Sequence, residues 1–350
     1  MEILFFIFLS SGLFLGWSLG ANDAANIFGT AVGSKMLKFK TAATIASIFI
    51  IIGAVYSGAG ASKTLESLGS VNALAGAFMV ALSAAISVYW MVRSGISVST
   101  SQAIVGAIVG WNIYSNRPTD IETLNIIASS WVICPILSAV IAFFSYFIVR
   151  KLLRHSHIHL LREDCYVRSG LIIIAAFGAY ALGANNIANV MGVFVASSPF
   201  HDINFHGLTL SSTQILFLIG SISICIGVFT YSQKTIHTIG NNLMYMTPAI
   251  AWIVVFSQSV VLFLFASSSL QTFLISHNLP SLPLVPVSSS QAVIGAIMGV
   301  GIAKGGRNIS WGIIGRIIIG WITTPIIAAG ICFISLFFLE NVFNQTVYLP

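Results

Sequence analysis

Asp23 is a carboxylate in a place where a carboxylate is costly. It follows an apolar run over residues 3–20, within the sequence GANDAAN, and no other acidic residue falls inside the apolar runs or their flanking motifs. An ionised carboxylate at the centre of a membrane span costs about 2.5–3.5 kcal/mol. The neighbouring Gly20, Asn22 and Asn26 predict a locally unwound helix whose carbonyl and amide oxygens hold a small cation. The alternative is that Asp23 caps a helix at the membrane surface.

A second copy of this motif, GANNIAN, begins at residue 183. It places Asn186 where the first copy has Asp23, flanked by Asn185 and Asn189. An amide offers an oxygen acceptor without a charge. We therefore expect a sodium-type site at Asp23 and a weaker one at Asn186.

Two clusters of hydroxyl residues each precede a helix rich in Gly, Ala and Ile. Hydroxyl side chains are good helix N-caps, and the N–H groups at a helix start attract anions. If both helix starts converge at the bilayer midplane, they bind a tetrahedral oxyanion without a lysine. Taken singly, each cluster is an ordinary helix cap. The predicted substrate-binding residues are Ser99, Thr100, Ser101 and Gln102 in the first cluster and Ser288, Ser289, Ser290 and Gln291 in the second.

The composition places these residues in a membrane protein. The chain has 350 residues, of which 57% are hydrophobic and only 7% are charged, against roughly 25% charged in a soluble domain. This excludes a soluble globule, a disordered chain and a coiled coil. The net charge of +6 does not indicate nucleic-acid binding, because basic residues of membrane proteins collect in cytoplasmic loops.

Ten apolar runs predict about ten transmembrane helix crossings. Two of them, 97–112 and 287–303, are short and form either full spans or re-entrant segments. Counted as crossings, the runs place twelve basic residues on one side and two on the other, and leave Arg316 inside the last run. The basic side is expected to be cytoplasmic, which puts both termini outside. Arg316 either faces a cavity or extends toward the cytoplasmic surface.

The chain also repeats itself. Three motifs of the first half recur in the second half in the same order. GANDAAN corresponds to GANNIAN, STSQ to SSSQ, and WVICP (131–135) to WITTP (321–325). We expect a first repeat at 1–149, a basic cytoplasmic linker at 150–168 and a second repeat at 169–350. An odd number of crossings per repeat inverts the second relative to the first. Inverted repeats with broken or re-entrant helices are typical of secondary transporters, whose substrates bind near the midplane.

These duplicated motifs resemble the inorganic phosphate transporter (PiT) family, and the resemblance covers nearly the whole chain. It implies cation-coupled phosphate uptake, with both GAN motifs near the ion and substrate sites and the serine clusters on phosphate. Two departures stand out: Asn186 replaces the aspartate of many relatives, and Ser97 stands where the second copy keeps Pro286. The short central linker is typical of a compact prokaryotic form.

We therefore predict a symporter that moves inorganic phosphate inward by alternating access, in a prokaryotic inner membrane. Sodium is the preferred coupling ion, with a proton on Asp23 as the alternative. Sulfate or another oxyanion is the nearest other substrate. An intramembrane lipid-phosphate enzyme is less favoured, because one carboxylate stands alone and no histidine lies deep in a span. No cofactor and no nucleic-acid partner are expected; membrane lipid is, and a homo-oligomer is compatible.

Overall fold

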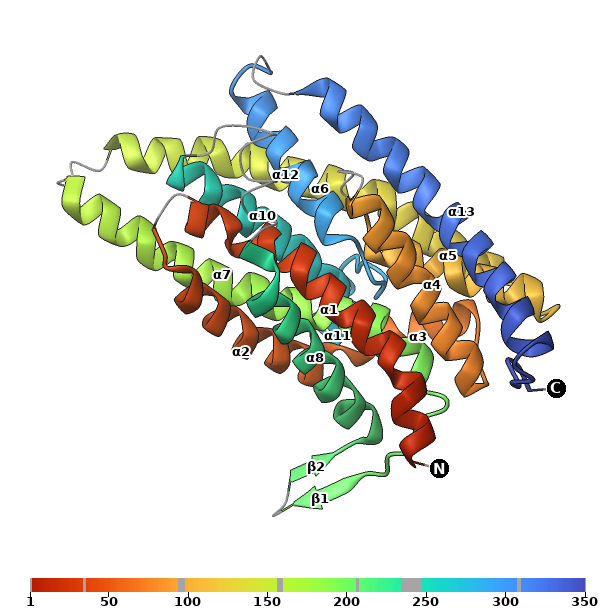
Figure 1. The fold of residues 1–350 in the computed structure, drawn as a ribbon. Coiled ribbons are helices and arrows are strands. Elements are labelled where there is room, and N and C mark those ends of the chain that lie inside the picture. The colour runs from red at the N-terminus through yellow and green to blue at the C-terminus, as the bar shows by residue number, and fades with distance from the viewer. Residues whose placement is uncertain are drawn as a thin grey trace.

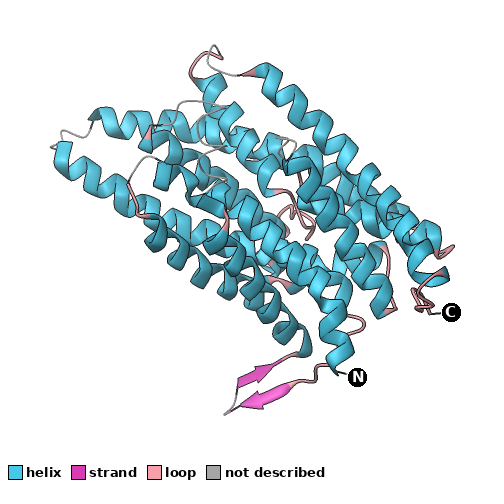
Figure 2. Ribbon diagram, in the orientation of Figure 1, coloured by secondary structure: helices cyan, strands magenta, loops and turns pink. Residues whose placement is uncertain are grey.

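The computed structural model describes residues 2–33, 36–93, 98–155, 160–205, 208–233, 247–306 and 310–349. These residues are mostly helical, with one short hairpin and several connecting loops (Figure 2). The hairpin pairs β1 with β2 in antiparallel register, Ile203 opposite Leu210. The elements are α1 Glu2–Gly33, α2 Phe39–Ser57, α3 Ala59–Leu68, α4 Leu74–Arg93, α5 Thr100–Tyr114, α6 Ile121–His155, α7 Leu160–Met191, η1 Gly192–Phe194, β1 Ile203–Phe205, β2 Leu208–Leu210, α8 Ser212–Thr230, α10 Pro248–Ala266, α11 Ser268–Ser276, α12 Ser289–Ala303 and α13 Trp311–Asn341.

Every predicted apolar run forms all or part of one of these helices. Within the described residues, eight are long and apolar enough to cross a membrane: α1, α2, α4, α6, α7, α8, α10 and α13. The two short runs form α5 and α12, of 15 residues each. At 1.5 Å per residue each is about 22 Å long, shorter than the roughly 30 Å hydrocarbon core. The predicted all-helical membrane fold is confirmed, and the two short runs are helices that begin partway along the bundle.

Both chain termini lie at one end of the bundle, and the junction of α6 with α7 lies at the other (Figure 1). We call these the terminal end and the junction end. Helices α4 and α8 both run toward the junction end. Their last residues are Arg93 and Thr230. The sequence predicts the junction end to be cytoplasmic, because the basic residues gather there.

The predicted linker at 150–168 is not a loop where the structure describes it. Helix α6 continues to His155 and α7 already begins at Leu160. The described parts of the linker, 150–155 and 160–168, contain neither Gly nor Pro, so no residue in these two stretches breaks a helix. Both helices therefore extend beyond their apolar runs.

The short helices pack against long helices from the opposite half of the chain. α5 lies against α13, and α12 lies against α6. A Cβ added to Gly106 of α5 would lie 2.5 Å from Pro325 Cα, and one added to Gly295 of α12 would lie 2.7 Å from Pro135 Cα. Small residues at helix crossings allow such close backbone approach. The two crossings use corresponding residues of the two sequence copies.

Helices α6 and α13 form two sides of the molecule with exposed apolar faces. Ile133, Ile136 and Phe144 are examples on α6, and Ile326 and Phe338 on α13, all at least 43% exposed. Such faces suit contact with lipid chains. Arg316 lies on the exposed face of α13, so it does not face the interior of the bundle.

Candidate ion and anion site

The two GAN motifs lie inside unbroken helices. α1 runs without interruption from Glu2 to Gly33, and α7 from Leu160 to Met191. The expected local unwinding around Asp23 is therefore wrong. Gly20 serves packing instead: a Cβ there would lie 2.8 Å from the carbonyl carbon of Ile224 on α8. Since the backbone carbonyls remain in the helix, ligands must come from side chains.

The hydroxyl clusters do start helices, as their sequence predicts. Ser99 has an extended backbone, and its Oγ accepts a hydrogen bond from Gln102 N at 3.2 Å. Ser288 repeats this arrangement with Gln291 N, also at 3.2 Å. Both helix starts thereby leave other N–H groups of the first turn without a helical partner.

The two helix starts are tied directly to each other. Ser101 Oγ donates to the carbonyl of Val287 at 3.1 Å, and Ser290 Oγ donates to the carbonyl of Val98 at 3.1 Å. The two bonds are equivalent in the two sequence copies. The donors Ser101 and Ser290 are 189 positions apart, and so are the acceptors Val98 and Val287. The N-termini of α5 and α12 therefore converge, as the anion-site prediction requires.

Each GAN motif contacts the hydroxyl cluster of the opposite half. Asn189 Nδ2 of α7 donates to Ser101 Oγ at 2.8 Å and to Asn186 Oδ1 at 3.1 Å. On α1, the Asp23 carboxylate interacts with the side chain of Ser289, and it accepts a hydrogen bond from Asn22 Nδ2 at 2.9 Å. The structure thus brings the four predicted segments together in one place.

All fourteen predicted site residues are buried, none more than 6% exposed. Several of their polar atoms have no hydrogen-bond partner, although buried polar groups are nearly always paired. A group of unpaired buried atoms on converging elements is what a polar ligand would satisfy. The unpaired atoms are Thr100 Oγ1, Gln102 Oε1, Asn185 Oδ1, Asn186 Nδ2, Asn189 Oδ1 and Gln291 Oε1.

Gln258 joins this site although the sequence motifs do not include it. It lies fully buried in α10, and its Nε2 donates to the backbone carbonyl of Asn26 at 2.8 Å while its Oε1 is unpaired. The sequence carries a signal for it, because an amide in the apolar run of α10 is costly unless it has a partner.

A cavity of about 340 Å³ reaches the site from the junction side. It lies over the middle of α1 and is bordered by the last turns of α4 and α8. Asn22, the neighbour of Asp23, forms part of its wall, and Arg93 is the charged residue among the described residues that line it.

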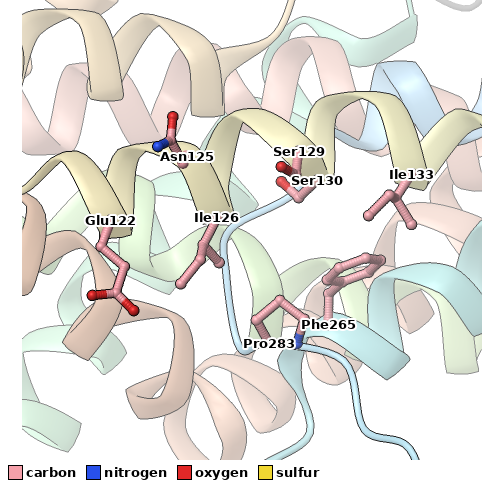
Figure 3. A pocket seen from close by; sticks show the side chains of 8 residues that line it. All are labelled: Glu122, Asn125, Ile126, Ser129, Ser130, Ile133, Phe265 and Pro283. Atoms are coloured by element: carbon pink, nitrogen blue, oxygen red, sulfur yellow. The ribbon is translucent and has the colours of Figure 1, made fainter.

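The terminal side is closed by an extended segment, residues 279–287, which we call the strap. Its carbonyls accept hydrogen bonds from side chains of three helices: Leu284 O from Thr64 Oγ1, Val285 O from Asn185 Nδ2 at 3.3 Å, and Leu282 O from Gln271 Nε2. A separate cavity of about 320 Å³ lies beyond the strap, where Pro283 and Phe265 face the side chains of α6 (Figure 3).

Comparison with known proteins agrees with this architecture. A relative from Methanocaldococcus jannaschii, named as a phosphate permease, is 28% identical over 95% of this chain and 97% of its own length. A phosphate permease relative from Pyrococcus abyssi is 25% identical over 90% of this chain and 93% of its own. A solved structure described as "The sodium-dependent phosphate transporter" shares the fold with a TM-score of 0.77 and 22% identity, and covers 98% of this chain and 100% of that one.

The sequence model of the Phosphate transporter family matches residues 19–164 and 158–332, well over half of the chain. The family is one of transporters and not of enzymes, as predicted. The matches include both GAN motifs and both hydroxyl clusters. The chain is therefore an integral membrane protein that belongs to the Phosphate transporter family.

Proposed function

We propose that this protein is a sodium-coupled symporter of inorganic phosphate that works by alternating access. The observation that carries the proposal is the convergence of two serine-capped helix starts beside a buried carboxylate. One part of this arrangement suits an anion and the other a cation. Phosphate transport itself follows from the family; the coupling ion, the residues and the mechanism are what we propose.

The anion half of the site consists of the N-termini of α5 and α12. Their free N–H groups and the unpaired Thr100 hydroxyl are donors, and the helix dipoles favour negative charge. Neutral donors fit a transporter, because they bind an oxyanion without holding it as tightly as a buried guanidinium would. Phosphate near neutral pH also carries a P–OH proton, which Gln102 Oε1 or Gln291 Oε1 can accept.

The cation half contains Asp23 with the amide oxygens of the two GAN motifs. Within the described residues Asp23 makes no ion pair with a basic side chain, and a buried carboxylate requires compensation by positive charge. Carboxylate, amide and hydroxyl oxygens are hard ligands that suit sodium. The structural relative is described as sodium-dependent, which favours sodium over a proton carried on Asp23.

Alternating access is supported by the paired contacts of the two halves. The exchanged Ser–Val bonds and the crossed packing of α5 and α12 are what an inverted repeat of residues 1–149 and 169–350 would produce. The proposed site contains residues of both halves, and a cavity bordered by Arg93 reaches Asn22. We place the junction end in the cytoplasm, both termini outside, and the protein in a prokaryotic inner membrane.

The test is phosphate uptake into proteoliposomes under an imposed sodium or proton gradient, run in parallel. We expect a sodium gradient to drive accumulation and Asp23→Asn to abolish it. Glu66→Gln removes an exposed carboxylate away from the site and serves as the control with normal uptake. Unchanged, sodium-dependent uptake by Asp23→Asn would refute the role of Asp23, and accumulation driven only by protons would refute sodium coupling.

Sulfate is the competing substrate, and the unpaired acceptors distinguish it. Sulfate at neutral pH has no proton to donate, so Gln102 Oε1 and Gln291 Oε1 would face it unfavourably. We expect excess arsenate, which is protonated like phosphate, to inhibit uptake of labelled phosphate far more than sulfate does. Strong inhibition by sulfate alone would reverse this assignment.

A further inference from the structure

The two sides of the site differ in how closely they are covered. Residues of α1 and α7 correspond at a spacing of 163, so Ser18 matches Ala181 and Asn22 matches Asn185. Ser18 is 7% and Asn22 5% exposed, and both line the open cavity, whereas Ala181 and Asn185 are 0% exposed. The strap accounts for the difference, because it lies directly against Asn185. Of these corresponding residues, only Ser18 and Asn22 on α1 have solvent-exposed surface.

The open cavity is lined by a positively charged side chain, and the predicted residues of the buried site include none. Arg93 lies at its edge, and its guanidinium donates to the Tyr89 hydroxyl at 3.1 Å. This bond uses one of five N–H donors of the arginine side chain. The others can reach a ligand in the cavity, and the planar guanidinium matches two phosphate oxygens at once. No acidic side chain belongs to the described lining of this cavity.

The cavity also has the size and the position for a hydrated anion. Its volume of about 340 Å³ corresponds to roughly eleven water molecules. Its wall includes Asn22, whose amide is bonded to Asp23. An anion held at Arg93 would therefore lie in a cavity that also borders Asn22 of the buried site.

We propose that this cavity is a second, weaker phosphate site, in which Arg93 binds the anion as it passes between the buried site and the junction-side solution. The inference rests on phosphate being the substrate of the buried site. A single partly exposed guanidinium binds phosphate weakly, and this suits a passage, because an ion must leave such a site as readily as it arrives. The buried site supplies neutral donors for selectivity, and the cavity supplies the positive charge.

Thiol labelling tests the cavity without depending on transport. In a Cys165→Ser background the remaining cysteines are buried. We would introduce Ser18→Cys, and Ala181→Cys as its counterpart, and treat the purified protein in detergent with anionic MTSES and cationic MTSET. Ser18→Cys should react, and Ala181→Cys should react at least about tenfold more slowly. Equal reactivity would show that the two sides are equally open and would overturn the proposal.

The charge of the cavity is tested by adding Arg93→Gln to Ser18→Cys. Loss of one charge from the same cavity lining should lower the ratio of the MTSES rate to the MTSET rate by about five- to tenfold. Lys304→Gln is the matched control, because Lys304 is an exposed base at the end of α12 that does not line the cavity. A ratio that Arg93→Gln leaves unchanged, or that Lys304→Gln changes equally, would overturn the role of Arg93.

Binding is tested with inorganic phosphate itself. Phosphate should slow the reaction of MTSES with Ser18→Cys, and Arg93→Gln should remove that protection while phosphate still raises the melting temperature through the buried site. Missing protection in a protein that phosphate does stabilise would overturn the second site and leave the proposed function intact. Missing protection together with missing stabilisation would instead refute the proposed function, and the second site with it.

Discussion

Replacing Gly295 by alanine tests whether the crossing of α12 and α6 positions the serine cluster. The added Cβ would lie 2.7 Å from Pro135 Cα, whereas nonbonded carbons lie at about 3.5–4.0 Å. The helices must therefore separate by about 1 Å. The bond from Ser290 Oγ to Val98 O, now 3.1 Å, would lengthen to about 4 Å, beyond hydrogen-bonding range.

Two effects should follow from this displacement. Overpacking of this kind costs about 1–3 kcal/mol of stability. Displacement of the α12 N-terminus should also weaken one or two hydrogen bonds to a charged ligand, each contributing about 1.5–3 kcal/mol. Loss of one such bond raises the half-saturating phosphate concentration by about tenfold to a hundredfold. Unfolding in denaturant measures the first effect, and phosphate-dependent uptake the second.

The matched control is Gly330→Ala on α13, because a Cβ at Gly330 has no other atom within 4 Å. This substitution adds a methyl group to an exposed helix position, where alanine is favoured over glycine by about 0.5–1 kcal/mol. It should leave uptake unchanged and stability equal or slightly higher. If Gly295→Ala behaved in the same way as Gly330→Ala, the argument that this crossing sets the geometry of the anion site would fail.

Three further predictions use other parts of the molecule. Thr64→Val removes a side-chain bond to the strap and should increase labelling of Ala181→Cys by about twofold to tenfold, as one net hydrogen bond implies; unchanged labelling would show that Thr64 does not hold the strap closed. Asn186→Asp adds a carboxylate to the second GAN motif and should lower the sodium concentration for half-maximal uptake by about three- to tenfold, which sodium titration would check. A hydrogen bond from Thr123 lowers the pKa of Asp120 below its ordinary value of 3.8, so Asp120 stabilises the protein above that pH and less as the pH falls through its lowered pKa. The melting temperature of Asp120→Ala should therefore lie below that of the wild type at pH 7 and approach it in strong acid.

The sequence predicts the elements of this fold well, because membrane burial imposes a simple rule on composition. Each apolar run became a helix, and each hydroxyl cluster became a helix start, since Ser99 and Ser288 satisfy N–H groups that no carbonyl can reach. The convergence of the two clusters could also be expected, because the inverted repeat that the sequence predicts would bring copies of one motif together between the halves.

The role of Gly20 could not be predicted in the same way. Glycine is compatible both with an unwound helix and with close packing, and only the position of Ile224 on another helix decides between them. Gln258 and the strap depend likewise on partners that are distant in sequence. Thr64 and Leu284, for example, are 220 residues apart, and neither carries a local pattern that would pair them.

The crossed packing of α5 on α13 has a consequence for how the protein is made. About 200 residues separate the end of α5 from the start of α13, so a ribosome working at 5–20 residues per second reaches the start of α13 roughly 10–40 s later. During that interval the Gly106 face of α5 has none of its final neighbours from α13. We therefore expect the start of α5, which is one half of the proposed anion site, to gain its packing against α13 only when that helix enters the bilayer, and a chain that stops short of α13 to lack a finished site.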